Sequence, residues 1–303
     1  MQNSNKKKEI GMNKKIISKA VIVFLWTVSI CWASGGTKGC ECPKSSGTKP
    51  PGEVKADAVD TVLQQLNKKT QELKSYEAQI EYKFIQPLLF GSETLRKGTL
   101  YYTRSGKKSK LRINFETLKQ DDEEEEKYLE EYIVLDGAFL SYPGHQFKGM
   151  WAVQIDYEME GVKYIQLAEA RDPNKPVDVF DLVSRNFPVV GFTKIEDLKK
   201  QFEATLVEPK KAKPEGFIQV HLKVKPNSVY KDDYVFIDFW IDKKLGLPAK
   251  IIAVSTEPAT EPIEQKDIYE IKFLRPKVNK VIDNNVFEFK IPEGFDKPEI
   301  IPL

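Results

Sequence analysis

Histidine and cysteine, the side chains that most often carry covalent or metal chemistry, are scarce in this sequence of 303 residues. Of its two histidines, His145 sits in a Pro-Gly-His turn and His221 lies on the polar side of an alternating, strand-like pattern. The sequence contains no HExxH motif, no Ser-His-Asp order and no motif of a nucleophilic cysteine. It also contains no P-loop and no GxGxxG that follows a strand. It therefore favours a protein that is not an enzyme and that has no catalytic residue, metal or cofactor.

Cys40 and Cys42 lie in a stretch rich in Gly, Ser, Thr, Lys and Pro, with no histidine nearby. Zinc requires about four ligands, so this pair does not make a zinc site. We interpret the pair as a short-range or intermolecular disulfide, which an oxidising compartment permits. A lipid anchor at Cys40 is the alternative, although Thr37 and Lys38 depart from the apolar and small residues expected before a lipidated cysteine.

Carboxylates are densest at Asp121–Glu126, where acidic residues follow one another without interruption. Calcium binds to many oxygen ligands, but the run lacks the glycine and the alternating ligands of a known calcium loop. We therefore expect a solvated loop between two strands.

Aromatic and aliphatic residues in the strand patterns are the other candidates for a site. The residues that we predict to line a ligand cavity are Tyr82, Phe84, Leu100, Tyr102, Phe115, Phe139, Phe239 and Ile271. A curled sheet can enclose a cavity, and an apolar lining would bind acyl chains with roughly 0.8 kcal/mol gained per buried CH₂. The same alternation also builds a packed core, so the sequence leaves cavity and core as alternatives.

The elements that must position these residues are mostly strands. Apolar residues recur with helical spacing over 57–74, which predicts one amphipathic helix. Alternation with a period of two predicts strands at 80–84, 99–103, 111–115, 218–225 and 269–273, among others. Asp136-Gly137 predicts a tight hairpin between 133–135 and 138–140. Residues 160–200 are predicted to form loops and short helices, around 177–185 and 193–200.

About nine to eleven strands without βαβ alternation predict a mainly β protein with helices (α+β) and an antiparallel sheet. A long antiparallel sheet must protect its edges, and curling is an economical way to do so. We therefore expect an incomplete antiparallel β-barrel.

The N-terminus predicts export. Lys14, Lys15 and Lys19 precede an apolar run over 20–33, and small residues follow, as in a secretory signal peptide. We place cleavage after Ala33, with an uncleaved anchor as the alternative. The predicted organisation is a signal peptide at 1–33, a flexible leader at 34–56 and one folded domain at 57–298.

Composition excludes one class of partner. The chain is 41% hydrophobic and 30% charged, with a net charge of +2. This is ordinary globular composition without a concentrated basic surface, so we expect no nucleic-acid binding.

Four motifs occur in an order that resembles the outer-membrane lipoprotein carrier family (LolA-like proteins). They are Gly98–Arg104 (GTLYYTR), Ile133–Pro143 (IVLDGAFLSYP), Ile241–Pro248 (IDKKLGLP) and Asn285–Phe295 (NVFEFKIPEGF). The resemblance covers most of 57–297. It differs from the family pattern at Ser105, where the family has proline, and in the long acidic linker at 119–131.

The resemblance implies a half-barrel closed by a helical lid, with Arg104 as the latch that holds the lid by hydrogen bonds until cargo enters. It implies a periplasmic monomer that binds the acyl chains of lipoproteins or lipids. Membrane-bound donor and acceptor proteins would be its partners, and delivery would be toward the outer membrane. The alternative is a periplasmic regulatory or scaffold protein that uses the same barrel to bind another protein. An enzyme is the third hypothesis.

Overall fold

The computed structural model describes residues 53–106, 108–169, 179, 195–208 and 215–303. The chain divides into two compact units, 1–50 and 51–303, and all described residues belong to the second. The predicted signal peptide, Cys40, Cys42 and the predicted helix at 177–185 (apart from Val179) lie outside the described residues. In the described part, no helix is both long enough and apolar enough to cross a membrane.

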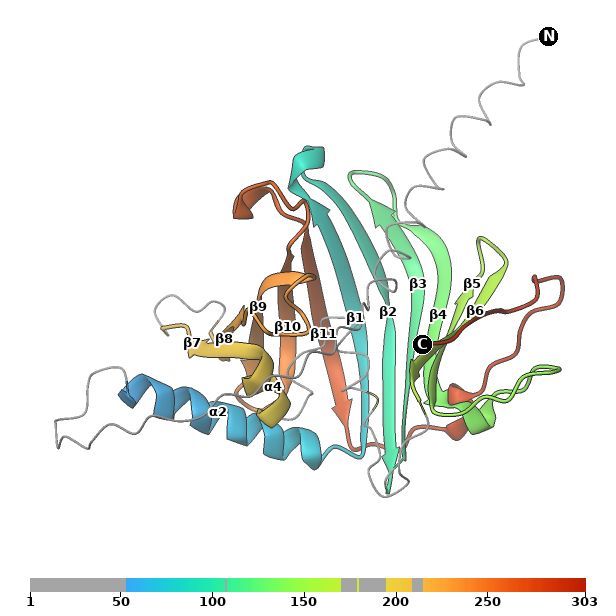
Figure 1. Cartoon of the computed structure of the whole chain (residues 1–303), viewed down its shortest axis with the longest axis horizontal. Helices are drawn as coiled ribbons and strands as arrows, with labels where there is room; N and C mark the ends of the chain where they lie inside the picture. Colours follow the sequence, from blue (N-terminus) through green and yellow to red (C-terminus); the bar gives the residue numbers. More distant parts are fainter. Residues whose placement is uncertain (1–52, 107, 170–178, 180–194, 209–214) are drawn as a thin grey trace, which may run out of the picture. The chain divides into compact units, whose positions relative to one another are not determined.

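The described chain forms one sheet of 12 strands (Figure 1). The strands are β1 (Ser75–Gln86), β2 (Ser92–Ser105), β3 (Lys108–Gln120), β4 (Glu126–Asp136), β5 (Met150–Asp156), β6 (Gly161–Ala168), β7 (Phe202–Leu206), β8 (Phe217–Val224), β9 (Tyr234–Asp242), β10 (Pro248–Ser255), β11 (Ile268–Val278) and β12 (Glu299–Ile301). Their order across the sheet is β12-β6-β5-β4-β3-β2-β1-β11-β10-β9-β8-β7. The helices are α2 (Glu53–Gln71) and α4 (Ile195–Gln201), and short 3₁₀ turns are η2 (Pro87–Leu89), η3 (Gly137–Phe139), η4 (Ile263–Gln265) and η5 (Asn284–Phe287).

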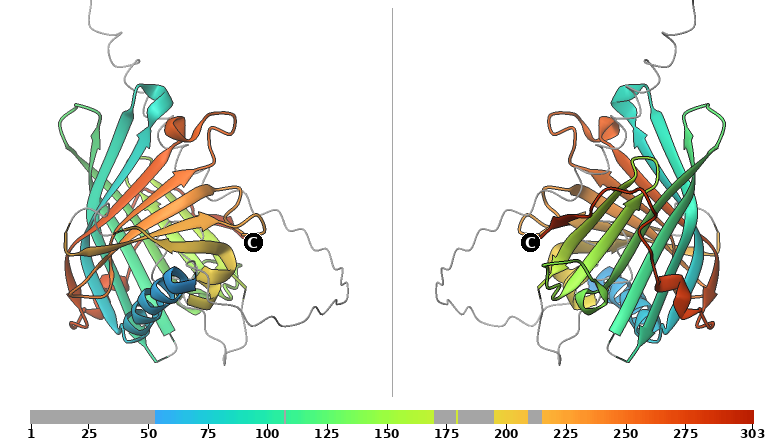
Figure 2. Two further views of the ribbon diagram at one scale, coloured as in Figure 1. Left: turned by 90° about the vertical axis from the view of Figure 1, so that its left-hand side faces the viewer. Right: turned by 90° about the vertical axis from the view of Figure 1, so that its right-hand side faces the viewer.

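Apart from β12, two antiparallel meanders make up the sheet, β1 to β6 and β7 to β11, and they join where β1 pairs with β11. The sheet curls but does not close, because β7 and β12 lie at its opposite edges (Figures 1 and 2). The predicted incomplete antiparallel β-barrel with helices is therefore confirmed. Only the β12–β6 pair is parallel within this sheet.

The strand count exceeds the predicted nine to eleven. β12 has three residues, too few for an alternating pattern to show. β6 occupies part of the segment that was predicted to be loops and helices, so that prediction is wrong there. Its residues are buried on both faces of the sheet at Val162, Tyr164 and Ile165, which hides the alternation.

The helices lie where the sequence placed them, with shifted ends. α2 begins at Glu53, within the predicted leader, and α4 covers most of the predicted helix at 193–200. Val59, Leu63 and Leu66 form the buried face of α2, which packs against β7 and α4. Asp60 of α2 and Lys199 of α4 form an exposed ion pair at 2.8 Å.

These helices cover one end of the inner face of the curled sheet, which we call the lower end (Figure 2). Tyr76, Leu100, Tyr102 and Leu111 lie at this end of β1, β2 and β3, and each is at most 1% exposed. The lower end is therefore packed core. The upper end carries η2, η4 and the β3–β4 turn (Figure 1).

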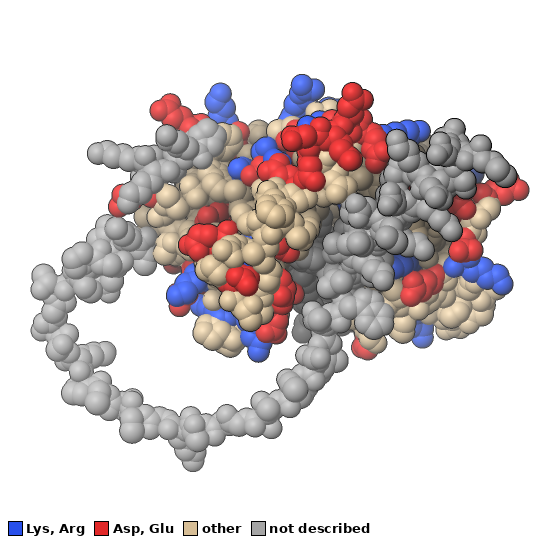
Figure 3. All heavy atoms as spheres, turned by 90° about the horizontal axis from the view of Figure 1, so that it is seen from above, with Lys and Arg blue, Asp and Glu red and all other residues tan. Residues whose placement is uncertain are grey.

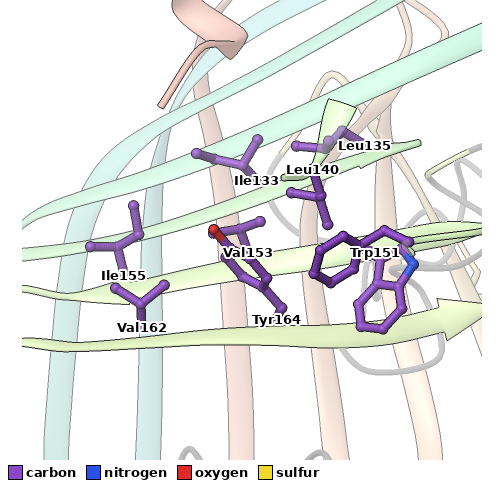
Figure 4. Close-up of a cluster of buried hydrophobic side chains, with 9 residues drawn as sticks. Ile133, Leu135, Leu140, Trp151, Val153, Ile155, Val162 and Tyr164 are labelled. Carbon is purple, nitrogen blue, oxygen red and sulfur yellow. The ribbon is translucent and has the colours of Figure 1, made fainter. Parts of the chain in front are cut away.

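A second core lies on the outer face of β4, β5 and β6 (Figure 4). Its buried members include Ile133, Trp151 and Tyr164, and residues of the C-terminal segment pack against it, including Phe289 and Phe295. Arg112 fastens this segment, because its Nη1 donates to the carbonyls of Val286 at 2.7 Å and Glu288 at 2.9 Å. Because the segment buries that face, these strands carry apolar residues on their outer side as well.

The tight hairpin predicted at Asp136-Gly137 is wrong. β4 ends at Asp136, η3 follows, and the chain pairs again only at Met150 of β5. The Asp136 carboxylate accepts a hydrogen bond from the Ala138 amide at 3.0 Å and caps η3. The Asp-Gly pair therefore ends a strand and starts a short turn, a second common use of this dipeptide.

Gly98 of β2 lies at a register shift in the β2–β3 pair, where the two backbones approach closely. A Cβ at this position would meet the Asn114 carbonyl oxygen at 1.8 Å. Because that atom belongs to a paired strand, it cannot move aside without breaking hydrogen bonds between the strands.

We predict that Gly98→Ala lowers the free energy of unfolding by about 2 kcal/mol or more, as overpacking against backbone does. Urea unfolding followed by circular dichroism measures this loss. Gly161→Ala is the control, because the nearest atom to its new Cβ lies at 3.9 Å. Equal stability of the two variants would contradict the prediction.

Candidate functional site

A strip of aromatic side chains crosses the inner face of the sheet. We define the aromatic strip as Tyr234, Tyr269, Phe84, Tyr82, Phe115 and Tyr132, from β9, β11, β1, β3 and β4. Ring centroids of neighbours lie close together: 4.9 Å for Phe84–Tyr269, 6.1 Å for Tyr82–Phe115 and 6.3 Å for Phe115–Tyr132. The strip is thus continuous across strands that are far apart in the sequence.

Strand register places these residues on one face. Tyr82 is opposite Ile271, and Ile271 is opposite Ile251, which is opposite Phe239. Side chains opposite one another on paired strands point to the same face of the sheet. The inward residues of successive strands therefore lie side by side on one face.

The upper part of this surface is less covered than the lower part. Tyr82, Phe84 and Tyr132 are only half-buried, whereas Tyr76 and Leu100, nearer the helices, are at most 1% exposed. The other members of the strip, Tyr234, Phe115 and Tyr269, are buried. The inner face therefore combines a packed lower end with an upper end that solvent reaches in part.

A buried ion pair lies beside the strip. Arg96 of β2 and Glu130 of β4 meet at 2.9 Å, and their side chains are only 5% and 2% exposed. The Glu130 carboxylate also accepts hydrogen bonds from Tyr132 at 2.7 Å, Gln154 at 2.8 Å and Tyr128 at 3.1 Å. The negative charge is therefore surrounded by donors, which compensates its loss of water.

The tyrosines in this network stay protonated. Burial raises the pKa of Tyr128 and Tyr132, and the nearby Glu130 carboxylate raises it further. Burial opposes the charge of Arg96, but Glu130 and the tyrosines outweigh this, so the pKa of Arg96 is raised. The guanidinium lies 5.1 Å from the centre of the Tyr128 ring and 5.9 Å from that of Phe115. The charge is thus held against the aromatic strip.

The two histidines lie outside the strip. His221 pairs with Asp238 at 2.7 Å, and both are on the outer face because Val220 and Leu222 point inward. His145 lies in the β4–β5 loop, with its ring 5.4 Å from that of Tyr142. Among the described residues, no group of three or more His, Cys, Asp or Glu is arranged to hold a metal.

The predicted acidic loop is the β3–β4 turn. Asp121–Glu126 is exposed throughout, as expected for a solvated turn between two strands. Glu125 pairs with Lys97 at 2.5 Å, which lowers the pKa of its carboxyl.

The structure brings together seven of the eight predicted cavity residues on the inner face. Leu100, Tyr102, Phe239 and Ile271 are 0% exposed and Phe115 2%, so they belong to the packed part, while Tyr82 and Phe84 lie at the upper end. Phe139 is instead 56% exposed in η3, outside the sheet, because the predicted hairpin does not form.

Arg104, the predicted latch, lies at the end of β2 beside the C-terminus of α2. Its Nη1 donates to the Gln71 carbonyl at 3.2 Å, and its backbone amide donates to the Lys74 carbonyl at 2.7 Å. Gln71 is the last residue of α2, where free carbonyls and the helix dipole favour a cation. Arg104 thus connects the sheet to the helix.

Sequence reasoning missed Arg96, Glu130 and Gln154. A signal was present for two of them: Arg96 is in phase with Leu100 and Tyr102, and Glu130 with Tyr132. A charged residue at an inward position indicates a partner on a neighbouring strand, but alternation cannot say which strand that is.

Fold and strip together define the class: an incomplete antiparallel β-barrel with an aromatic inner face. No family model matches the sequence, and no curated protein matches it. A DUF1329 family protein from Desulfovibrio piger is similar in structure, with a TM-score of 0.39 and 11% identity over 76% of this chain and 97% of that chain. An outer membrane lipoprotein-sorting protein domain from Vibrio parahaemolyticus is also similar in structure, with a TM-score of 0.38 and 11% identity. The match covers 77% of this chain and 97% of that domain. TM-scores below 0.5 do not establish a family.

We predict that Glu130→Leu lowers the free energy of unfolding by about 3–5 kcal/mol, because it leaves the Arg96 charge buried without its partner. Adding Arg96→Met should restore most of this loss. Arg96 Nε and Gln154 Oε1 have no hydrogen-bond partner among the described residues, so the network is incompletely satisfied and an apolar pair can replace it. A double-mutant cycle by urea unfolding measures the coupling, and additive losses would contradict the prediction.

Proposed function

We propose that this protein is a periplasmic carrier that binds the acyl chains of lipoproteins or lipids on the inner face of its half-barrel and delivers them toward the outer membrane. The observation that supports this most is the aromatic strip, in which Tyr82, Phe84 and Tyr132 are only half-buried. Neighbouring rings offer flat apolar surface, which suits a long hydrocarbon chain.

Carrying requires no covalent step. Each buried CH₂ contributes roughly 0.8 kcal/mol, so a long acyl chain would bind without specific polar contacts. Release then requires an acceptor that offers more burial, or movement of the helices across the inner face. In this proposal α2 and α4 act as the lid, and they must therefore have two arrangements of similar free energy. In this proposal the protein works as an exported monomer between membrane-bound donor and acceptor proteins, without a cofactor.

A regulatory or scaffold protein is the second candidate, and one feature favours it. Within the described sheet, β7 is an edge strand that pairs only with β8. A strand at the edge of a sheet can accept a strand from another protein. The packed lower end of the inner face also agrees with a barrel that serves as a rigid support.

We predict that Phe84→Asp weakens binding of a fluorescent fatty-acid probe at least tenfold, because a carboxylate replaces part of the aromatic strip. Ile85→Asp is the matched control, since Ile85 is also half-buried but points to the outer face of the same strand. Probe titration and native mass spectrometry with organic extraction measure binding and any copurified lipid. If the wild-type protein carries no lipid and takes up no probe, the carrier proposal fails.

We predict that Arg104→Leu changes the rate of cargo transfer to acceptor membranes, because it removes the bond from β2 to the Gln71 carbonyl of α2. Arg104→Lys keeps a cation at the helix C-terminus and should retain most of the wild-type rate. Transfer of a fluorescent acylated peptide between vesicles measures this. Unchanged transfer by Arg104→Leu would rule out Arg104 as the latch of a lid.

A further inference from the structure

The turn between β1 and β2 exposes large apolar side chains at the upper end of the sheet. Leu88, Leu89 and Phe90 are exposed by 43%, 56% and 107%. Phe90 has a φ of 58°, in the left-handed region that bulky residues rarely adopt. Short turns built from Asn and Gly connect strands without such strain. Connecting β1 to β2 therefore does not by itself require the apolar residues Leu88, Leu89 and Phe90 in this turn.

A second turn extends the apolar surface. η4, in the β10–β11 connection, contacts η2 and carries Ile263, which is 43% exposed. We define the apolar tip as Leu88, Leu89, Phe90 and Ile263. Single exposed apolar residues are ordinary, but neighbouring ones on two adjoining turns indicate an interaction surface.

The turns around the apolar tip are acidic. Asp121 ties the β3–β4 turn to the start of β2, because its carboxylate accepts from the Glu93 amide at 2.7 Å and the Ser92 hydroxyl at 3.2 Å. The exposed acids of the flanking turns include Asp121, Asp122, Glu123, Glu124, Glu257 and Glu264. Figure 3 looks onto this end and shows acidic side chains gathered there.

The lysines near the apolar tip are Lys83, Lys97, Lys119, Lys127 and Lys266, which are fewer than the acids of this end and neutralise only part of their charge. Lys83 and Lys97 pair with Glu93 at 2.6 Å and Glu125 at 2.5 Å, acids other than those just named. Lys266, in the same connection as η4, is buried, and its ammonium donates to the Thr256 carbonyl at 2.6 Å. The exposed surface beside the apolar tip is therefore negative.

We propose that the apolar tip docks into an apolar pocket of a partner protein whose rim is basic. An aromatic side chain that enters a pocket supplies much of the binding energy of an interface, and opposite charges at the rim speed association. An anionic membrane would be repelled by the acidic turns. The proposal is independent of acyl binding, because the apolar tip lies outside the aromatic strip.

The test uses the full chain and two synthetic amphipathic helices, one of Leu and Lys and the other of Leu and Glu. Fluorescence anisotropy measures binding of each peptide at low and high salt. Phe90→Asn is the variant, since Asn tolerates a positive φ. Phe139→Asn is the matched control, because Phe139 is 56% exposed in a 3₁₀ turn at the lower end, beside Lys108 and Lys110.

We expect the Leu/Lys helix to bind and to weaken with salt, with at least a tenfold loss in Phe90→Asn and no loss in Phe139→Asn. Equal binding of both helices, or no effect of Phe90→Asn, would overturn the proposal. Sedimentation with phosphatidylcholine vesicles, with and without phosphatidylglycerol, tests the membrane as occupant. Vesicle binding that depends on Phe90, in place of peptide binding, would also overturn it.

Discussion

Pairing of β1 with β11 is the constraint on which the rest of the structure depends. It joins two meanders that are each built from local hairpins, and it aligns Tyr82 and Phe84 of β1 with Ile271 and Tyr269 of β11. Without this pairing the aromatic strip would be divided into two halves. Its partners are separated by most of the folded chain, so forming it carries a loop-closure cost that the other antiparallel pairs, whose strands follow one another in sequence, largely avoid.

Different segments of the chain bury the two faces of the sheet. The helices cover the lower end of the inner face, and the C-terminal segment covers the outer face of β4 to β6. Neither covers the upper end of the inner face, where members of the aromatic strip stay half-buried. The candidate site is thus the part of this surface that the described helices and the C-terminal segment leave partly exposed, which is why the same strands contain both core and site.

The buried Arg96–Glu130 pair matters more for strand register than for net stability. A buried ion pair contributes little net stability, because desolvation offsets the attraction between its charges. What the pair does provide is register: Arg96 on β2 and Glu130 on β4 meet across β3 only in one alignment of these strands. A slip of either strand by one residue would move its charge to the outer face and separate the pair.

The sequence by itself determined the properties that depend on local order. A period of two assigned seven of eight candidate residues to one face, helical spacing placed α2 and α4, and uninterrupted charge marked the exposed turn at Asp121–Glu126. Tertiary structure alone decided which of those faces are packed, which strands join the two meanders, and which inward charges meet. Phe139 shows the limit: its alternation matched a strand, but the chain turns at Gly137 and leaves it exposed. The physical reason is that alternation records only that a face is buried, while what buries it comes from residues far along the chain.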